Sequence, residues 1–325
     1  MKCDANKWQP NTTFAMLKRR AKLFADIRAY FDSQGVLEVH TPTLMPHTVT
    51  CPNTEAVSVA VDGFSKPLFL QTSPEYALKR LIADGSGDVY HMGPAFRNEA
   101  IGRWHQLEFT MLEWYRMGFD DTALIADVAD LLKAVGIEQE HETMTYQDAF
   151  LRHTGLDPLN VSCEECLAWL QARDASISQG MSDLPLDALL QYVFASYVET
   201  QFDPHVPMFV THFPANQAAL ARLDSENPLL ARRFELYFGG LECANGFDEL
   251  TDPLEQRARF ELDQKHRLER GLPEREIDPA FMAALEHGLP RCAGVALGVD
   301  RLLAATTGAN ALAEVMAFHL ANHNK

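Results

Sequence analysis

The stretch GVALGVDRL, residues 294–302, places a permanent cation, Arg301, directly after a run of small and apolar residues. Its small residues, among them Ala296 and Gly298, would let a ligand come close to the backbone. The stretch therefore predicts a strand that a ligand can approach closely and that turns into a helix just after the arginine.

Acidic side chains recur in RFELYFGGLECANGFDEL, residues 233–250, with a spacing that suits a metal ion. If Gly239-Gly240 is a two-residue hairpin loop, the flanking strands pair residue by residue. The predicted pairs are Phe238 with Leu241, Tyr237 with Glu242, and Glu235 with Ala244. Glu235 and Glu242 then share one face, about 7–8 Å apart at Cβ, and repel each other unless a cation such as Mg²⁺ lies between them. An ordinary solvent-facing strand with incidental acids is the alternative.

Gly246 predicts a local irregularity in the same stretch. A glycine inside a strand commonly marks a bulge or a bend, because it has no side chain to pack there. A bulge inserts one residue and re-aims the side chains that follow it. We therefore expect Gly246 to re-aim Asn245 and Glu249.

The residues PAFRNEAIGRWHQLEFTMLEWY, 94–115, describe a strand end with Arg97, a polar loop and a returning strand. Because side chains alternate along a strand, Phe109, Glu113 and Tyr115 project from one face. An arginine, an aromatic ring and carboxylates on one open face suit a nucleotide, with phosphate on the guanidinium and the base on the ring. A surface hairpin with a half-buried aromatic stripe is the alternative.

These segments lie among helices and strands that the sequence pattern predicts. Helices are expected at 14–34, at 74–85, after Asp120 or Asp121, at 253–270 and at 278–288, and strands at 35–42, 67–73, 88–97, 105–118, 206–215 and 233–247. Residues 140–205 are mostly helical in character and form an inserted segment without recognisable chemistry. The sequence predicts one α+β domain, residues 1–325, with a mostly antiparallel sheet flanked by helices.

The composition favours a soluble enzyme, with 47% hydrophobic and 22% charged residues. A net charge of −17 disfavours a broad nucleic-acid-binding face. The start of the chain has no apolar signal region, and no segment offers about 18 uninterrupted apolar residues. We therefore expect a cytoplasmic protein that does not enter a membrane.

The first predicted helix carries the basic residues Lys18, Arg19, Arg20 and Lys22. Charges of one sign on a helix most commonly form a solvated face. A docking surface for an acidic partner is the alternative interpretation.

Three of these segments together resemble motifs 1, 2 and 3 of the class II aminoacyl-tRNA synthetases. GVLEVHTPTL with Pro42 matches motif 1, FRNE…HQLEFTMLEWY matches motif 2, and GVALGVDRL matches motif 3. The resemblance implies the class II catalytic core, activation of a carboxylate by ATP, and a homodimer formed through motif 1. It also implies that Arg301 reaches the γ-phosphate and lies against the adenine, opposite Phe109.

Within this class the chain resembles the lysyl-tRNA synthetases, because TSPEYALKRL (72–81) and ELYFGGLECANGFDELTDP (235–253) match their lysine-site segments. The match implies that Glu75 binds the amino group next to the substrate carboxylate. It implies an ATP site formed by Arg97, Asn98, Glu99, Gln106, Phe109, Glu242, Cys243, Gly298 and Arg301, with Arg97 and Arg301 as catalytic residues. It implies a substrate site formed by Ser73, Pro74, Glu75, Tyr115, Asn245, Glu249 and Ala296. Glu235 and Glu242 would hold Mg²⁺.

Two departures from the lysyl-tRNA synthetases make the chain similar to a family of their truncated paralogs. Lysyl-tRNA synthetases carry an N-terminal anticodon-binding barrel, whereas motif 1 starts here at residue 35, so no anticodon-binding domain is expected. Their motif 3 reads Gly-x-Gly-x-Gly-x-Asp-Arg, whereas Ala296 stands here at the middle glycine. The opening WQPNTTFAMLKRRA is also similar to the paralogs. Gln106-Leu107 departs from both relatives, which usually show Asn-Pro.

The truncated paralogs attach β-lysine to a lysine of elongation factor P, a protein shaped like a tRNA. The resemblance therefore implies a ligase that uses ATP and Mg²⁺ to adenylate (R)-β-lysine and then transfers it to an ε-amine of elongation factor P. The methyl group of Ala296 is worth roughly 1–3 kcal/mol of discrimination, and we expect it to crowd α-lysine. A tRNA-aminoacylating enzyme and a small-molecule amide ligase of the same fold are the alternatives, and the acidic charge argues against tRNA.

Overall fold

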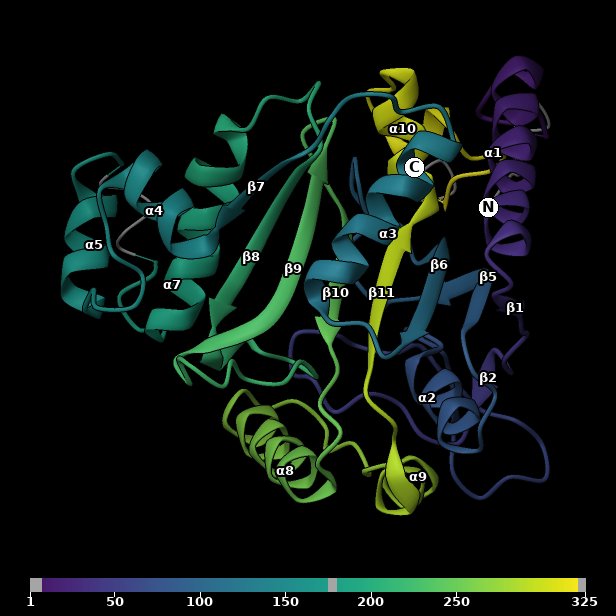
Figure 1. Ribbon diagram of the computed structural model, residues 1–325. Coiled ribbons are helices and arrows are strands. Elements are labelled where there is room, and N and C mark those ends of the chain that lie inside the picture. The colour runs from purple at the N-terminus through teal and green to yellow at the C-terminus, as the bar shows by residue number, and fades with distance from the viewer. Residues whose placement is uncertain (1–7, 175–179, 321–325) are drawn as a thin grey trace.

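The computed structural model describes residues 8–174 and 180–320. An eight-stranded sheet, in the order β1-β5-β6-β11-β10-β9-β8-β7, runs through the middle of these residues (Figure 1). Its strands are β1 (Leu37–Glu38), β5 (Val89–Phe96), β6 (Glu108–Met117), β7 (Glu142–Thr145), β8 (Met208–Pro214), β9 (Leu230–Phe238), β10 (Leu241–Asp248) and β11 (Cys292–Gly298). Neighbouring strands are antiparallel except β1 with β5 and β7 with β8. The predicted α+β fold on a mostly antiparallel sheet is confirmed.

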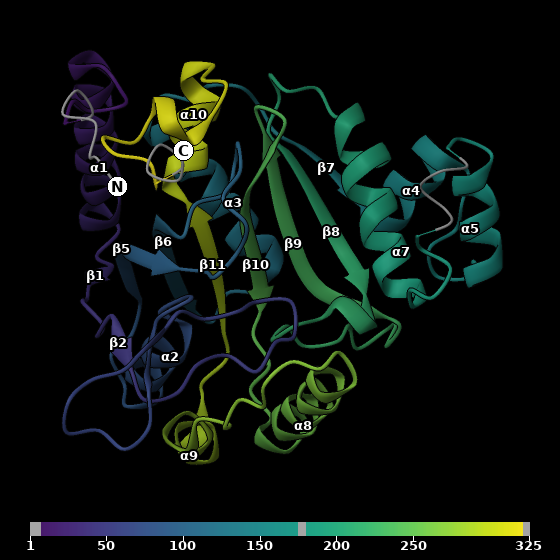
Figure 2. The same cartoon turned by 180° about the vertical axis from the view of Figure 1, so that it is seen from behind.

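Helices and a second, three-stranded sheet surround this core. The small sheet has the order β2 (Leu44–Met45), β4 (Leu68–Leu70) and β3 (Ser58–Val59). The α-helices are α1 (Phe14–Ser33), α2 (Glu75–Ala83), α3 (Asp121–Ala134), α4 (Tyr146–Thr154), α5 (Cys163–Gln171), α7 (Leu186–Val193), α8 (Pro253–Glu269), α9 (Pro279–Gly288) and α10 (Val299–Thr307). Helix α1 stands at the β1 end of the large sheet, and α4, α5 and α7 gather at the β7 end (Figure 2).

The central strands have a different neighbour on each face. On β6, Leu112 and Trp114 point into a core that Leu124 of α3 completes. Helix α3 contacts β9, β10 and β11 on the same side. Because side chains alternate along a strand, Glu113 and Tyr115 point to the opposite face. One face of the sheet therefore forms the core, and the other remains available for polar residues.

The ends of the helices follow the signals in the sequence. The side chain of Thr13 accepts a hydrogen bond from the backbone of Met16 at the start of α1. Just past the end of α1, Gly35 adopts the left-handed φ of 69° that commonly follows a helix. Asp120 caps α3 by accepting from the backbone of Ala123. The predicted helices at 14–34 and after Asp120 are confirmed.

The segment between 140 and 205 is less uniformly helical than the sequence predicts. Its first ordered element is β7, a four-residue edge strand parallel to β8. A strand this short has no periodicity that a sequence could reveal, and it is formed by its pairing with β8. Helices α4, α5 and α7 follow, as expected. The part of the helical prediction on residues 175–179 lies outside the described residues.

The basic cluster on α1 is divided between solvent and the interior. The guanidinium of Arg20 forms an ion pair with Asp300, next to Arg301, and donates a 2.7 Å hydrogen bond to Thr110 Oγ1. The remaining members of the cluster are exposed: Lys18, Arg19 and Lys22. The expected solvated face is therefore wrong for Arg20, because the buried carboxylate of Asp300 requires a counter-charge.

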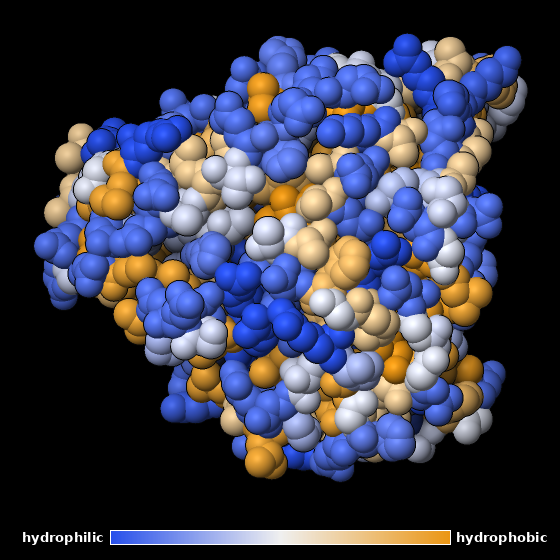
Figure 3. Space-filling model, in the orientation of Figure 1, coloured by the Kyte–Doolittle hydropathy of each residue, from blue (hydrophilic) through white to orange (hydrophobic). Residues whose placement is uncertain are grey.

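Polar and charged residues cover most of the face seen in Figure 1, and apolar residues are scattered over it in small groups (Figure 3). Scattered apolar side chains of this kind are normal on a protein surface. Throughout residues 8–174 and 180–320, no helix has the length and apolar character that crossing a membrane requires.

Strands β9 and β10 form the predicted hairpin, and both loop residues, Gly239-Gly240, have the positive φ angles that such a loop needs, 64° and 72°. Next to the loop the register is as predicted, with pairs Phe238–Leu241 and Tyr237–Glu242. A β-bulge at Cys243 then adds one residue, so Glu235 pairs with Asn245 and not with Ala244. The predicted pair of Glu235 with Ala244 is wrong, and the bulge brings Asn245 to the face that carries Glu235.

Gly246 does not mark the bulge, and this expectation is wrong as well. It is paired regularly with Phe234 of β9 and Val295 of β11. A Cβ at this position would lie 2.4 Å from Phe234 Cζ and 3.0 Å from Val295 Cβ. The glycine therefore makes room for a core phenylalanine at the centre of the sheet.

Substituting Gly246 by alanine should destabilise the protein by about 1–3 kcal/mol, because the added methyl overpacks the core beside Phe234. Urea unfolding followed by fluorescence measures the change in the free energy of unfolding. Gly102→Ala is the matched control, since a Cβ at Gly102 meets no atom within 4 Å. Equal stability of the two variants would contradict the packing role.

Candidate active site

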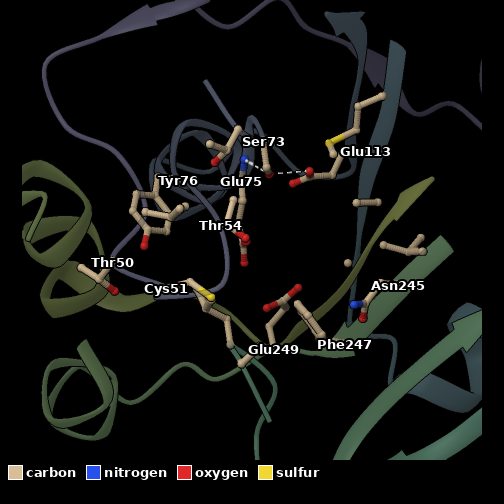
Figure 4. Close-up of a pocket in the computed structure, with 18 of the residues that line it drawn as sticks. Thr50, Cys51, Thr54, Ser73, Glu75, Tyr76, Glu113, Asn245, Phe247 and Glu249 are labelled. Carbon is tan, nitrogen blue, oxygen red and sulfur yellow. Dashed lines mark hydrogen bonds between the residues drawn. The ribbon is translucent and has the colours of Figure 1, made fainter. Parts of the chain in front are cut away.

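A cavity of about 190 Å³ lies on the face of the sheet opposite α3 (Figure 4). Strands β6, β10 and β11, the start of α2, residues 49–54 and part of α8 line it. The predicted residues that line this cavity are Ser73, Glu75, Arg97, Tyr115, Asn245, Glu249 and Ala296. Pro74, between Ser73 and Glu75, precedes the first turn of α2. The sheet and one helix N-terminus thus bring together residues more than 200 positions apart.

Three carboxylates from different elements converge on the cavity (Figure 4). Glu75 begins α2, Glu113 lies on β6 and Glu249 directly follows β10. Glu113 and Glu249 are buried. The hydroxyl of Ser73 donates a 2.7 Å hydrogen bond to one oxygen of Glu113, and the hydroxyl of Tyr115 donates a 2.9 Å bond to the other.

Burial makes two of these carboxyls much weaker acids than usual. The pKa of Glu113 is raised to about 8, chiefly by burial and next by the charge of Glu75. The pKa of Glu249 is also raised to about 8, chiefly by burial, which outweighs the opposing charge of Lys79. Burial disfavours the ionised form until an opposite charge approaches. The cavity therefore favours protons or other cations.

A lysine of the protein itself lies among the carboxylates. Lys79, one turn along α2 from Glu75, is 1% exposed. Its Nζ is 2.6 Å from Glu75 Oε1 and 2.6 Å from Glu249 Oε2. Burial lowers the pKa of Lys79, but the charges of Glu249 and Glu75 outweigh burial and raise the pKa above its usual value. Lys79 is therefore a permanent ammonium inside the cavity wall.

Two small residues of β11 shape the cavity. A Cβ at Gly294 would lie 2.2 Å from Tyr115 Cε1 and 2.6 Å from Glu249 Oε1, so only glycine allows both side chains to approach the strand. Ala296, two residues further on, pairs with Glu113 of β6 and Asn245 of β10. Its methyl group lies on the face of the sheet that lines the cavity.

The hairpin of β5 and β6 brings Arg97 and Phe109 together, as the sequence predicts. The pair Ala95–Phe109 lies near the loop of the hairpin. The guanidinium of Arg97 is 5.3 Å from the centre of the Phe109 ring. Arg97 Nε is buried without a hydrogen-bond partner among the described residues, and so is Gln106 Oε1. Asn98 is held by a 2.7 Å backbone hydrogen bond to the carbonyl of Glu55.

The predicted metal residues lie on β9 and β10, separated from this hairpin by β11. Glu235 is buried, pairs with Arg233 and accepts a hydrogen bond from the hydroxyl of Tyr237. Its pKa is raised, chiefly by burial and, against the charge of Arg233, also by the charge of Glu242. Asn245 Nδ2 lies 3.4 Å from Glu235 Oε1. Glu242 is half-exposed and remains open to a ligand.

A third carboxylate approaches Glu235 and Glu242 from the inserted segment. The pKa of Glu199, in a 3₁₀ turn over Glu199–Gln201, is raised to about 7, chiefly by burial and next by the charges of Glu242 and Glu235. Within the described ranges, no group of three or more His, Cys, Asp or Glu side chains is arranged to hold a metal ion. Glu235 and Glu242 fit a Mg²⁺ that takes its other ligands from phosphate and water.

Arg301 lies at the first turn of α10, just after Gly298, which stands at the N-cap position. Its guanidinium donates a 2.9 Å hydrogen bond to the carbonyl of Glu242 and lies 3.2 Å from His105 Nε2. Asp300, on its other side, is fixed by Arg20. The cation therefore stands between the metal residues and the hairpin loop.

The other predicted ATP residues lie around this second area. Glu99 is half-buried in the hairpin loop, where its charge acts on His105. The thiol of Cys243 is buried and lies 3.6 Å from the carbonyl of Phe238, so only its backbone faces a ligand. The site thus has two parts. One is the cavity with Glu75, Glu113 and Glu249, and the other is the area with Arg97, Arg301, Glu235 and Glu242.

A family model described as tRNA synthetases class II (D, K and N) matches residues 6–322. The chain belongs to this family. A curated protein of Proteus mirabilis (strain HI4320), named elongation factor P–(R)-beta-lysine ligase, is 47% identical over 321 residues, which are 96% of this chain and 97% of that protein. Proteins with the same name from Pasteurella multocida (strain Pm70) and Yersinia pestis (strain Pestoides F) are 46% and 45% identical. They cover 98% and 97% of this chain, and the matches span 99% and 98% of their own lengths.

The structure of this class II synthetase family member adds two charged residues that sequence reasoning did not place in the site, Lys79 and Glu199. Glu113 lies on the face that alternation along β6 predicts for it, together with Tyr115. Lys79 lies four residues after Glu75 on a predicted helix, which puts both on one side of α2. Glu199 comes from the segment that was expected to carry no chemistry, and its position depends on long-range packing.

Glu113→Gln should reduce the pH dependence of stability of the class II core. The pKa of Glu113 is raised from 4.5 to about 8, so the folded protein holds a proton that the unfolded chain releases. The wild type should therefore lose stability as the pH rises from about 5 to 8, and one such proton accounts for up to about 1.4 kcal/mol per pH unit. Glutamine resembles the protonated form and removes this loss. Urea unfolding across this range measures the two slopes, and parallel slopes would contradict the assignment.

Proposed function

We propose that this chain is an ATP-dependent, AMP-forming ligase that adenylates (R)-β-lysine and transfers it to a lysine ε-amine of elongation factor P. The names of the relatives, which match nearly the whole chain at 45–47% identity, support this proposal. The observation that carries it is a cavity lined by three carboxylates and by Arg97, which follows β5 six residues beyond His91, the strand partner of Glu113. This arrangement suits an amino acid with two ammonium groups and one carboxylate.

The charges of the cavity orient the substrate. Glu75 and Glu249 bind its ammonium groups together with Glu113, whose proton is displaced when the substrate enters. Arg97 then meets the substrate carboxylate at the boundary with the ATP area. Fixing the reacting groups in this way removes the entropy cost of bringing them together.

In the first step the substrate carboxylate attacks the α-phosphate of ATP, forming the acyl-adenylate and releasing pyrophosphate. Arg97 neutralises the α-phosphate and Arg301 the γ-phosphate, while the ring of Phe109 stacks on the adenine. The chain contributes fixed charges, and no side chain acts as a nucleophile. Mg²⁺ held by Glu235 and Glu242 would neutralise further phosphate charge when bound.

In the second step the ε-amine of the acceptor lysine attacks the acyl carbon, and AMP leaves as the amide forms. Asn98, Glu99, Gln106, Cys243 and Gly298 contribute to the ATP site, with backbone contacts from Cys243 and Gly298. The acceptor can be tested directly by the intact mass of elongation factor P after incubation with the enzyme, ATP and (R)-β-lysine. We expect the addition of one β-lysyl residue. An unmodified acceptor together with charged tRNA would contradict the proposal.

The enzyme should act as a homodimer in the cytoplasm, with β1 near the two-fold axis. This strand ends the large sheet, and Leu37 on it is 55% exposed, which supports pairing with a second copy. Static light scattering at micromolar concentration measures the mass, and a monomer would contradict this assembly.

Arg97→Ala and Arg301→Ala should each slow adenylation by about 10²- to 10³-fold, because each removes a fixed cation that a phosphate group needs. ATP–pyrophosphate exchange measures this step. Arg257→Ala, which removes an exposed arginine that pairs with Glu286 on α9, is the control and should keep wild-type exchange. Near-normal exchange in either test variant would exclude that arginine from the first step.

Ala296→Gly should shift the enzyme from β-lysine towards α-lysine. The methyl group lies on the cavity face beside Glu113 and Asn245, and α-lysine carries its amino group one carbon closer to the carboxylate than β-lysine. One methyl is worth about ten- to two-hundredfold in discrimination. Adenylation kinetics with both isomers measure the ratio of kcat/KM values. If the ratio does not move towards α-lysine in the glycine variant, Ala296 does not select the substrate.

A further inference from the structure

The buried ammonium of Lys79 has no place in the chemistry described above. Its side chain is buried in the middle of α2. Its two ion-pair partners are the carboxylates of Glu75 and Glu249, which we assign to the substrate. Its Nζ also lies 5.9 Å from the centre of the Tyr115 ring. A lysine that is 1% exposed cannot swing out to react with a ligand in water.

The charges that face Lys79 can be counted element by element. Glu75 comes from α2, Glu113 from β6 and Glu249 from the end of β10, which gives three negative charges when all are ionised. Lys79 supplies one positive charge, so the group carries two net negative charges. The uncharged groups nearby are the hydroxyl of Tyr115 and the thiol of Cys292, and burial raises the pKa of both.

Two further charged residues, Asp263 and Arg97, line the cavity, but neither belongs to the group around Lys79. Asp263 of α8 accepts a 2.7 Å hydrogen bond from Thr50 and faces the positive side chains of Arg267 and Arg259. Arg97 lies just beyond β5, six residues from the strand partner of Glu113, where the carboxylate of the substrate is expected. The three carboxylates around Lys79 therefore form a separate group within the cavity.

We propose that Lys79 is a specificity-determining residue that sets this group to two net negative charges, so that the cavity selects a ligand with two ammonium groups. A ligand with two ammonium groups leaves the buried group neutral. A ligand with one ammonium group leaves an unpaired buried charge or requires a carboxyl to keep its proton, and either costs affinity. The inference rests on the proposed function only for the identity of the ligand.

A purely structural role for Lys79 makes a different prediction. If the ammonium only holds α2 against the end of β10, its loss should weaken ligand binding both in the wild type and in the Glu249→Gln variant. If it sets the charge, its loss weakens binding in the wild type but restores two net charges when one carboxylate has already been removed. Glu249→Gln provides that background, because Glu75 and Glu113 remain.

The experiment is a double-mutant cycle with Lys79→Met, Glu249→Gln and the double variant, measured by calorimetry with (R)-β-lysine as the probe. Each single change should lower the affinity by about tenfold or more. In the Glu249→Gln background, Lys79→Met should raise the affinity, which is a reversal of sign. Because this comparison needs only Glu249→Gln and the double variant, it holds even if Lys79→Met alone does not fold.

Three controls make the outcome specific. ATP affinity should be unchanged in all variants, and Lys133→Met, which removes a surface lysine of α3, should behave as the wild type. The probe 6-aminohexanoate carries a single ammonium group, so Lys79→Met should not raise its affinity in the Glu249→Gln background. A loss of β-lysine affinity on Lys79→Met in both backgrounds, or an equal gain for both ligands, would overturn the inference.

The failure of this inference can be told apart from that of the proposed function. If the wild type binds β-lysine and shows the sign reversal but does not modify elongation factor P, only the proposed acceptor is wrong. If it modifies elongation factor P and the reversal is absent, only the role of Lys79 is wrong. If it neither binds β-lysine nor modifies elongation factor P, both the proposed function and the role of Lys79 are wrong.

Discussion

The alternation of side chains on the central strands is the constraint on which the rest of the structure depends. On β6, Leu112 and Trp114 pack under α3, while Glu113 and Tyr115 face the cavity. A shift of one residue in the register would exchange the two sets. Because α3 and α10 pack on one face, the strand side chains that act on a ligand must come from the other. Along each central strand, residues that stabilise the core therefore alternate with residues that face the cavity.

The cost of gathering carboxylates out of water shapes the cavity. Three acids that face each other in a buried space would repel one another if all were ionised. Contacts within the chain, from Lys79, Ser73 and Tyr115, offset part of this cost, and the raised pKa values of Glu113 and Glu249 offset more. Arg97 follows β5 six residues beyond the strand partner of Glu113, so the site has a negative and a positive part. Such a dipolar site orients an amino acid before any reaction begins.

Much of the fold and part of the site could be predicted from local patterns. The helices with caps, such as α1 and α3, and the loop Gly239-Gly240 follow from signals within a few residues. The approach of Arg97 to Phe109 follows from the hairpin, because both lie next to its loop. The resemblance of three segments to known motifs then supplied the roles of residues that local patterns cannot assign.

The features that could not be predicted depend on contacts between distant parts of the chain. The bulge at Cys243 has no local signature, and Gly246, which suggested one, is required instead by the ring of Phe234. Arg20 lies in a basic cluster that resembles a solvent face, and only the position of Asp300 shows that it points inward. Strand β7 forms only because β8 offers an edge.

The bulge at Cys243 also changes which residue numbers of β10 face the ligand. Before it, the even-numbered Glu242 faces the ligand, and after it the odd-numbered Asn245 and Glu249 do so. If the strand paired regularly through Cys243, without the bulge, alternation from Glu242 would turn both later side chains towards α3 without altering any catalytic residue type. A deletion or insertion of one residue between Asn245 and Glu249 would turn Glu249 in the same way. Across the lineage of this enzyme, insertions and deletions should therefore be absent between Asn245 and Glu249 even where substitutions accumulate.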